Sequence, residues 1–331
     1  MSVCERTSDR GSVSELLRCP ATGQLLRQAA DGSLIRDDGR AIYPVISGVP
    51  VLINEGRSTF RIVDYQRVAR FSPTASRRGR LARSIDHHLP SLTLNMRSRE
   101  NFRLLAELVR EQDGADERPR VLIVGAGDGG EGVDTLVDDM RIECVETDVA
   151  LGPRTQIVCD AHDLPFADGA FDAVVCQAVL EHVLDPVRVV GEIHRVLAPG
   201  GLVYSEIPFM QQVHGGAYDV TRFSLIGHRR LYRLFDEVIS GVQGGPGMAL
   251  SWSLWYFLRS FARSRKGRAI AFLASRLAFS WLKYFDPWLG RSPAAVDAAS
   301  GTFFLGRRRE EAVSDEAILA SYRGAGSCRP Q

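Results

Sequence analysis

The stretch Val121-Leu122-Ile123-Val124-Gly125-Ala126-Gly127-Asp128-Gly129-Gly130 decides the fold of this chain. Its first four residues are aliphatic, too few to form a helix face, and they predict a strand buried on both sides. Glycines at 125, 127 and 129 follow at once and permit a tight turn with no Cβ between backbone and ligand. A strand, a glycine turn and a helix N-terminus form the usual cradle for a nucleotide-like ligand. The same residues also fit the dinucleotide-binding pattern G-x-G-x-x-G, or a turn that binds no ligand. Which of these applies can be judged only from the sequence that follows.

Composition limits the class of protein. The chain has 331 residues, 45% of them hydrophobic and 24% charged, which predicts a globular protein with one large domain and additions. A net charge of +1 argues against a nucleic-acid partner. The six cysteines are scattered, as expected for reduced thiols. The polar N-terminus predicts no signal peptide, and no apolar run is long enough to span a membrane. We therefore expect a cytoplasmic protein.

Strands and helices alternate after the glycine turn, which predicts a parallel sheet of the α/β class. Further strands are expected at 142–147, 156–159, 171–177 and 202–207, with an amphipathic helix at 186–197. Glu146 and Asp148 end the second strand, about 20 residues beyond the glycines, where a carboxylate can accept both hydroxyls of a ribose.

Four motifs in order carry a family resemblance. They are V-G-A-G-D-G-G (124–130), D-A-H-D-L-P-F-A-D-G-A-F-D (160–172), Q-A-V-L-E-H-V (177–183) and R-V-L-A-P-G-G-L (195–202). Residues 119–240 thus resemble class I S-adenosylmethionine-dependent methyltransferases, of the broad group that contains small-molecule and quinone-methylating enzymes. The resemblance implies a doubly wound, seven-stranded, Rossmann-like sheet, S-adenosyl-L-methionine as cofactor, and methyl transfer to a small-molecule acceptor or one linked to a lipid or glycan.

The resemblance also assigns ten residues to the cofactor. They are Gly125, Ala126, Gly127 and Gly129 at the methionine part, Asp148 at the ribose with Glu146 as alternative, Asp160 and Ala161 at the adenine, and Gln177 and Ala178 after the fourth strand.

The acceptor is expected at the loop 208–223, because ligands of open α/β sheets gather at the carboxyl ends of strands. His214 is predicted to take or position the acceptor's proton, with His182 as its rival on the opposite wall of the cavity. Tyr218, Asp219 and Arg222 are candidate substrate residues; the alternative is a surface loop with an internal Asp219–Arg222 ion pair. The sulfonium cofactor is already activated, so no metal is expected.

Residues 16–56 predict a small β-rich module. The segments C-P-A-T (19–22) and A-I-Y-P-V-I-S-G-V-P-V-L (41–52) resemble the zinc-ribbon-like domain of the methyltransferase-activator type. That family carries a C-P-x-C motif and a second cysteine pair, but Thr22 replaces the second cysteine here and no pair follows near 35–38. One thiolate cannot form a structural zinc site, so the module is predicted to be metal-free. It is either a stabilising appendage or a docking site for a partner.

The segment 246–299 is predicted to be a helical insertion before a last strand at 301–307. No acidic residue occurs between Val238 and Phe285, whereas seven arginines and lysines do, and all four tryptophans lie in or just after that segment. Two helices fit, at 249–264 and 268–284, with narrow polar stripes: Arg259, Arg263 and Lys266 on one, Arg276, Ser280 and Lys283 on the other. Such helices either cover the core as a lid or lie on an anionic membrane surface.

The remaining boundaries complete the domain prediction. We expect a disordered tail at 1–15, a helical linker or cap at 57–118, the methyltransferase core at 119–245 plus 300–309, and a C-terminal tail at 310–331. Two other functions share the glycine turn: an NAD(P)-dependent oxidoreductase, which does not explain the Q-A-V-L-E-H-V or L-A-P-G-G-L motifs, and a non-catalytic scaffold, which would bind cofactor weakly or not at all.

Overall fold

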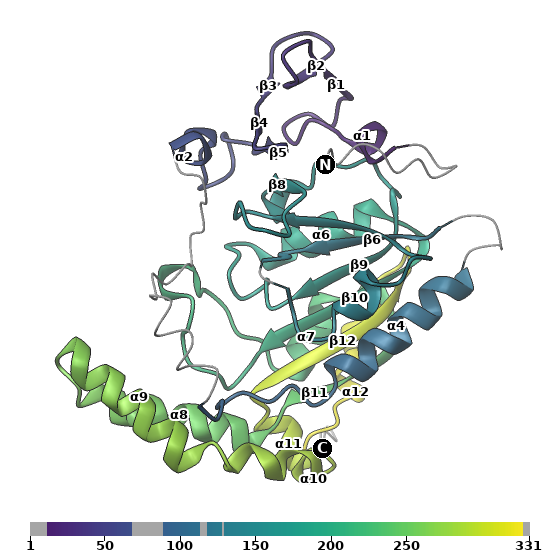
Figure 1. The fold of residues 1–331 in the computed structure, drawn as a ribbon. Coiled ribbons are helices and arrows are strands. Elements are labelled where there is room, and N and C mark those ends of the chain that lie inside the picture. Colours follow the sequence, from purple (N-terminus) through teal and green to yellow (C-terminus); the bar gives the residue numbers. More distant parts are fainter. Residues whose placement is uncertain (1–11, 68–88, 113–117, 128, 327–331) are drawn as a thin grey trace.

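The computed structural model describes residues 12–67, 89–112, 118–127 and 129–326. Its centre is a nine-stranded, mostly parallel sheet (Figure 1). The strands are β4 (Val45–Ile46), β5 (Val49–Leu52), β6 (Arg120–Val124), β7 (Glu143–Asp148), β8 (Ile157–Cys159), β9 (Phe171–Gln177), β10 (Leu197–Pro208), β11 (Phe235–Gly244) and β12 (Gly301–Arg308). Their spatial order is β11-β12-β10-β9-β6-β7-β8-β5-β4.

The seven strands from β6 to β12 form the predicted doubly wound core. Strand β6 lies in the middle, with β7 and β8 on one side and β9 and β10 on the other, and all of these pairs are parallel. Strand β12 returns between β10 and β11, antiparallel to both. The chain changes direction across the sheet between β6 and β9, and the crevice outside their carboxyl ends is where such folds bind ligands. The predicted fold class is confirmed.

Helices cover both faces of this sheet (Figure 1). They include α4 (Ser98–Gln112), α5 (Asp134–Val137), α6 (Pro186–Val196) and α7 (Leu225–Leu231). Side chains of β6 alternate between the faces, since successive strand residues point in opposite directions. Leu122 and Val124 join the core that contains α6, whereas Val121 and Ile123 join the core that contains α4. The aliphatic run 121–124 is therefore buried on both sides, as its composition predicts.

The N-terminal module contains a separate antiparallel sheet. Its elements are α1 (Val13–Leu16), β1 (Leu26–Gln28), β2 (Leu34–Arg36) and β3 (Ile42–Tyr43), followed by α2 (Ile62–Arg67). Part of the predicted tail is thus helical, and residues 1–11 lie outside the described residues. The thiol of Cys19 is buried, 3.1 Å from the Tyr43 hydroxyl oxygen. A zinc-ribbon fold is not shown by these elements.

The module is not a detached appendage, because β5 continues the central sheet. It pairs parallel to β8, with Val51 opposite Val158 and Leu52 opposite Cys159. Val51 and Leu52 have no exposed surface. The sequence predicted a small β-rich module here. It did not predict this pairing, because an apolar run shows that a strand is buried but not which strand lies beside it.

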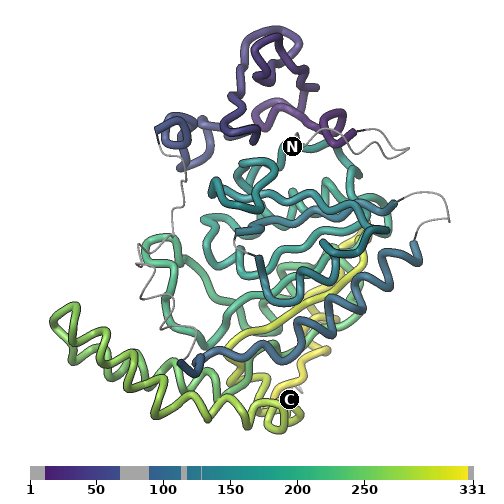
Figure 2. The backbone as a smooth tube through the Cα atoms, viewed as in Figure 1, coloured from purple at the N-terminus to yellow at the C-terminus, as the bar shows by residue number. Residues whose placement is uncertain are grey.

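The helical insertion lies at the end of the molecule opposite β1–β3 (Figures 1 and 2). It consists of α8 (Pro246–Ser260), α9 (Arg265–Phe279), the 3-10 helix η3 (Leu282–Phe285), α10 (Asp286–Leu289) and α11 (Pro293–Asp297), while α12 (Asp315–Ala320) follows β12. Helices α8 and α9 form a hairpin that projects as an arm (Figure 2). Helix α8 begins earlier than predicted, because the Asp286 carboxylate accepts hydrogen bonds from the N–H groups of Gly247 and Met248. Among the described residues no helix is long and apolar enough to cross a membrane.

One polar stripe of the insertion faces the protein rather than the solvent. Arg276, Ser280 and Lys283 are 5%, 6% and 5% exposed. Arg276 donates to the carbonyl oxygens of residues 89 and 90, and Lys283 to those of residues 91 and 93. Arg276 and Lys283, two of the seven basic residues considered above for contact with a lipid surface, are therefore buried. Their charged groups donate hydrogen bonds to these backbone carbonyls.

Candidate active site at the carboxyl edge of the sheet

The glycine turn after β6 is fixed against the neighbouring strand. The N–H groups of Gly125 and Ala126 donate to the Thr147 carbonyl oxygen at 2.8 and 2.9 Å. Gly125, Gly127 and Gly129 have φ of 75°, 46° and 91°, a region that other residues rarely adopt. A Cβ on Gly125 would also lie 2.3 Å from a methyl group of Val179. All three positions therefore need glycine for their conformation, and Gly125 also needs it for space.

Asp148 lies directly against this turn. Its Oδ2 accepts a 2.7 Å hydrogen bond from the Gly127 N–H, and its Oδ1 accepts one of the same length from Ala150. Glu146, its predicted alternative, is buried and paired with the Arg154 guanidinium at 2.7 Å. Of the two carboxylates, Asp148 is the one that the fold holds at the turn, and Glu146 is engaged in an ion pair.

Asp160 directly follows β8 and is hydrogen-bonded to the N-terminal segment. Its Oδ2 accepts a hydrogen bond from the Ser58 hydroxyl at 2.5 Å, and its Oδ1 accepts one from the His162 N–H at 3.0 Å. Burial acts to raise the pKa of Asp160, but hydrogen bonds from His162 and Ser58 outweigh burial and lower it. Ala161 is buried in the following 3-10 helix η1 (Ala161–Asp163). Asp160, a predicted adenine contact, is therefore hydrogen-bonded to Ser58, which lies in the segment 57–118 that was predicted to be a linker or cap.

Gln177 is the last residue of β9, and Ala178 follows it. Ala178 is exposed and adopts φ of 54°, a strained conformation that in proteins is concentrated at functional sites. The Gln177 side chain lies across the glycine turn, since a Cβ on Gly130 would be 1.7 Å from its oxygen. Beneath the turn remains a cavity of about 20 Å³. A nucleoside needs more room than this cavity has, so the Gln177 side chain would have to move aside for such a cofactor to bind.

A buried acid that was not among the predicted site residues lies beside Gln177. Glu206, near the end of β10, accepts hydrogen bonds from Gln177, Asn95 and Tyr204. Burial raises the pKa of Glu206. Its place directly after an apolar run, at the carboxyl end of a strand, is the pattern that could have identified it.

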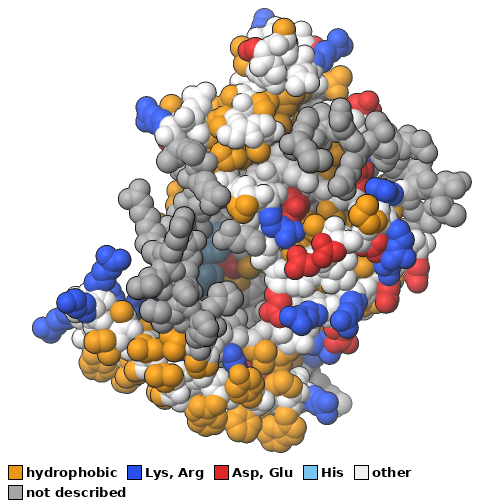
Figure 3. Space-filling model, viewed as in Figure 1, with side chains coloured by type: hydrophobic (Ala, Val, Ile, Leu, Met, Phe, Trp, Pro, Cys, Tyr) orange, Lys and Arg blue, Asp and Glu red, His pale blue; other side chains and the backbone are white. Residues whose placement is uncertain are grey.

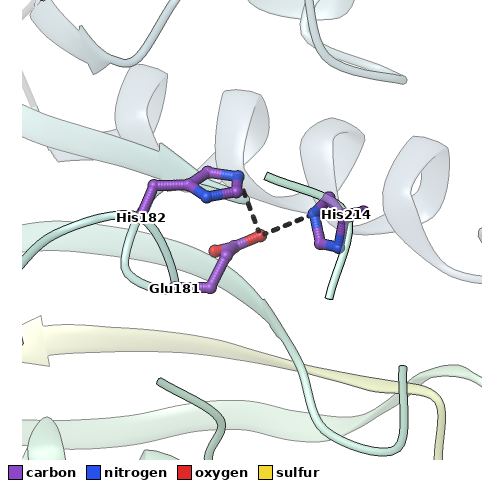
Figure 4. A group of neighbouring side chains, drawn as sticks. All are labelled: Glu181, His182 and His214. Carbon is purple, nitrogen blue, oxygen red and sulfur yellow. Dashed lines mark ion pairs between the residues drawn. The ribbon is translucent and has the colours of Figure 1, made fainter. Parts of the chain in front are cut away.

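A cluster of three polar side chains lies where the loop after β10 meets the segment after β9: Glu181, His182 and His214 (Figure 4). The Nε2 atoms of both histidines lie 3.8 Å from Oε1 of Glu181, and the two rings are 5.3 Å apart. Burial raises the pKa of Glu181 to about 8 and lowers that of His214. His182 and His214 were predicted on opposite walls; this is wrong, because the loop after β10 folds back onto the segment after β9.

The loop after β10 is organised by the ion pair that the sequence analysis left as an alternative. Asp219 pairs with Arg222 and accepts hydrogen bonds from the N–H groups of His214 and Gly215, at 2.6 and 3.0 Å. Arg222 also donates to loop carbonyls. Tyr218 stacks on Phe60 at a ring distance of 5.9 Å, so its ring is packed against the N-terminal segment.

The insertion helix α8 contacts this loop. Trp252 packs edge-on against His214 at 6.1 Å, and the Tyr256 hydroxyl donates to the Val213 carbonyl oxygen. Gln212 donates to the Ser253 hydroxyl at 3.0 Å. The predicted insertion therefore reaches the candidate site directly.

A larger cavity, of about 440 Å³, lies elsewhere. Its lining includes Arg18, Cys19, Asp163 and Arg195, between the N-terminal module and α6. None of the predicted site residues lines it. The predicted site residues lie at or after the carboxyl ends of strands β6–β10 instead.

Comparison with known families identifies one part of the chain. Residues 132–205 match the family model described as a methyltransferase domain. This part of the chain is similar to methyltransferase domains. The match spans the elements from α5 into β10, including the strained residue after β9. At the level of this domain, the predicted enzyme class and its cofactor S-adenosylmethionine are confirmed.

Curated relatives of the methyltransferase domain act in quinone biosynthesis, to judge from their names. Demethylmenaquinone methyltransferase of Renibacterium salmoninarum is 35% identical over 108 residues, 30% of this chain and 46% of that protein. Ubiquinone biosynthesis O-methyltransferase of Pseudomonas aeruginosa is 41% identical over 66 residues, 19% of this chain and 27% of that protein. The chain thus spans less than half of the length of these relatives.

Among solved structures, a putative sarcosine dimethylglycine methyltransferase from Galdieria sulphuraria matches with a TM-score of 0.40 and 16% identity, covering 63% of this chain and 86% of that one. Phosphoethanolamine N-methyltransferase 2 of Haemonchus contortus in complex with S-adenosyl-L-methionine matches with a TM-score of 0.40 and 16% identity, covering 65% and 54%.

Proposed function

We propose that this protein transfers a methyl group from S-adenosylmethionine to a small-molecule or lipid-linked acceptor. The observation that carries the proposal is that two groups of predicted site residues lie at the same carboxyl edge of the sheet, where Val179 of the segment after β9 lies against Gly125. One group is the glycine turn with Asp148, and the other is the polar cluster after β9 and β10. The sulfonium supplies an activated methyl group, so the protein's main task is to align the acceptor for in-line attack and exclude water.

The chain's own residues divide the cofactor between them in this proposal. Gly125, Gly127 and Gly129 let the backbone approach the methionine part, and Asp148 receives the ribose hydroxyls. Asp160, Ala161, Gln177 and Ala178 complete the adenine and cofactor walls. Ser58 contributes by holding Asp160 in place.

On the acceptor side, His182 and His214 are the candidates for taking a proton. Both rings lie against Glu181, and His214 also lies against Trp252. Among the described residues the buried indole N–H of Trp252 has no hydrogen-bond partner, so it can bind a polar acceptor atom. Asp219 and Arg222 position this loop through their ion pair.

Calorimetric titration with S-adenosylmethionine tests the cofactor assignment. Asp148→Ala should weaken binding by about 1–3 kcal/mol, the cost of losing charged hydrogen bonds. Gly127→Val should abolish it, because a branched residue is strained at φ of 46° and occupies the space of the ligand. Asp138→Ala, an exposed carboxylate on the same segment, is the control and should bind like the wild type. Wild-type affinity in the first two variants would refute the assignment.

A lipid-linked acceptor and an anionic membrane surface are favoured by the outer face of the insertion. Ten large apolar side chains are exposed there, and we call them the apolar stripe. They are Leu250, Phe257, Phe261, Ile270, Leu273, Leu277, Trp281, Tyr284, Phe285 and Trp288. Figure 3 shows hydrophobic side chains gathered along the lower face of the molecule, over α8–α10. Monomeric proteins rarely expose so continuous an apolar surface without a partner.

Charge indicates which partner covers the apolar stripe. Arg263, Arg265, Lys266 and Arg268 are exposed at the turn between α8 and α9. Interfacial helices bind anionic bilayers through such a combination of aromatic and aliphatic side chains with cations. Because α8 also contacts the loop at the site, binding at the membrane would bring the crevice close to an acceptor held in the bilayer.

Sedimentation with phosphatidylglycerol vesicles at low salt tests this part. The wild type should sediment, and the double variant Trp281→Ser/Trp288→Ser should not. Arg265→Gln/Lys266→Gln should weaken binding by about 1 kcal/mol per charge. Val187→Ser removes an exposed apolar side chain outside the apolar stripe and should change nothing. If the wild type does not sediment with the vesicles, the proposed membrane surface is refuted. It is also refuted if the wild type is a dimer and the double tryptophan variant is a monomer, because the apolar stripe would then be covered by a second copy of the chain.

A further inference from the structure

Glu181 is a buried acid without a hydrogen-bond partner. It has no exposed surface, and among the described residues neither of its carboxylate oxygens has a hydrogen-bond partner. Burying an unpaired carboxylate is costly unless a charge or a hydrogen bond compensates it. The methyl transfer proposed above assigns no role to this side chain, so its position requires another explanation.

Two histidine nitrogens face the same carboxylate oxygen. Oε1 of Glu181 lies 3.8 Å from Nε2 of His182 and 3.8 Å from Nε2 of His214. These distances are too long for hydrogen bonds. All three ligand atoms lie within 4.8 Å of one another. Atoms bound to one cation at about 2.0–2.2 Å lie roughly 3–3.6 Å apart, so small side-chain rotations would bring them to coordination distance.

The other nitrogen of each ring is already engaged. Nδ1 of His182 lies 2.8 Å from the Tyr218 carbonyl oxygen. Nδ1 of His214 lies 3.3 Å from the Gln212 carbonyl oxygen and 3.3 Å from Oδ2 of Asp219. Since a carbonyl oxygen can only accept, these contacts favour a proton on each Nδ1 and a lone pair on each Nε2, facing Glu181 (Figure 4). Metal-binding histidines are oriented in the same way by carbonyls and carboxylates behind them.

We propose that Glu181, His182 and His214 bind one divalent transition-metal cation, of the kind that two imidazoles and a carboxylate hold in zinc and non-haem iron sites. The sequence predicted no metal, because the N-terminal module lacks its cysteines and methyl transfer does not require one. The proposed metal site lies outside that module. It forms where the loop after β10 folds against the segment after β9. Three protein ligands leave at least one position open toward the crevice.

The open position indicates the class of acceptor, a step that rests on the proposed function. A divalent cation lowers the pKa of a hydroxyl group bound to it, so the proton can leave to solvent near neutral pH. The oxygen lone pair then forms the bond to the methyl carbon, and the sulfur keeps the electron pair of the broken carbon–sulfur bond. A hydroxylated acceptor is therefore favoured over a carbon or nitrogen nucleophile, and the two histidines hold the cation instead of taking the proton.

Metal titration of the full chain, without cofactor or acceptor, tests the site. After treatment with a chelator and buffer exchange, calorimetry with ZnCl₂ and separately with MnCl₂ should show one site per chain for at least one of the two. Glu181→Gln and His214→Ala should each weaken binding at least tenfold. Cys19→Ser and His194→Ala are matched controls outside the site and should bind like the wild type. The same cation should raise the melting temperature of the wild type but not of the two site variants, whose melting without metal shows whether they are folded.

Two outcomes would overturn the proposal. One is the absence of stoichiometric binding by the wild type for both cations, and the other is unchanged binding in folded Glu181→Gln and His214→Ala. Loss of binding in Cys19→Ser would move the site to the N-terminal module and also overturn it. Because the titration needs no S-adenosylmethionine, its failure leaves the methyl-transfer proposal intact, and failure of cofactor binding leaves this result unaffected.

Discussion

Helices α6 and α9 are both amphipathic, yet they present opposite faces to the protein. Helix α6 buries Val189, Val190, Ile193 and Val196 against the sheet. Helix α9 buries only Ser275 and Arg276, and its aliphatic side chains point outward. Amphipathicity in a sequence therefore shows that a helix has an apolar face and a polar face, but not which of the two packs against the protein. Helix α6 packs against the apolar surface of the sheet. Helix α9 and η3 instead pack against the segment 89–93, whose backbone carbonyls accept hydrogen bonds from Arg276 and Lys283.

Alanine substitution of matched isoleucines should separate the two helices most clearly. Ile193→Ala in α6 should lower the free energy of unfolding by about 2–5 kcal/mol, because it leaves a cavity in the core. Ile270→Ala in α9, at a position 67% exposed, should change it by less than about 0.5 kcal/mol. Urea unfolding of both variants measures the difference. An equal loss in both would mean that the apolar stripe is covered by the protein itself.

The buried polar stripe of the insertion predicts the second effect. Arg276→Met should cost about 1–3 kcal/mol of stability, because the carbonyl oxygens of Leu89 and Pro90 lose their donor. Arg268→Met, which removes an exposed arginine from the same helix, should be nearly neutral. Thermal unfolding checks the pair, and a neutral Arg276→Met would show that α9 does not depend on its polar stripe.

A smaller effect is expected from the pH dependence of stability, which should include a contribution from the buried, neutral side chain of His228. His228 in α7 makes hydrogen bonds with Ser205 and Thr302, and burial lowers its pKa from 6.5 to about 3. The unfolded chain therefore binds a proton that the folded chain excludes, and stability is lost as pH falls from about 6.5 toward 3. Between pH 7 and pH 5.5 the loss should be about 1 kcal/mol. His228→Gln should lose correspondingly less over that interval in urea unfolding; an identical slope would contradict the expectation.

Most of the fold could be predicted because it is encoded locally. The run 121–124 and the glycines after it specify a buried strand and a tight turn without reference to any distant residue. Asp148 could be found in the same way, by its place after the next apolar run. The pairing of β5 with β8, the contact of Ser58 with Asp160 and the burial of Arg276 could not, because each depends on a partner about 100 residues or more away.

The candidate reaction site divides along the same line. By itself the sequence determined the alternating elements, the glycine turn and the carboxylate at the end of β7, and it singled out His182 and His214 as candidates. Each follows from residue type and from position relative to a strand end. Only the tertiary structure decided that His182 and His214 share one wall, that both face Glu181, and that the apolar stripe points outward. Those arrangements depend on how the loop after β10 and the insertion fold back onto the core, and the physical reason is that such long-range packing leaves no periodic pattern in the chain.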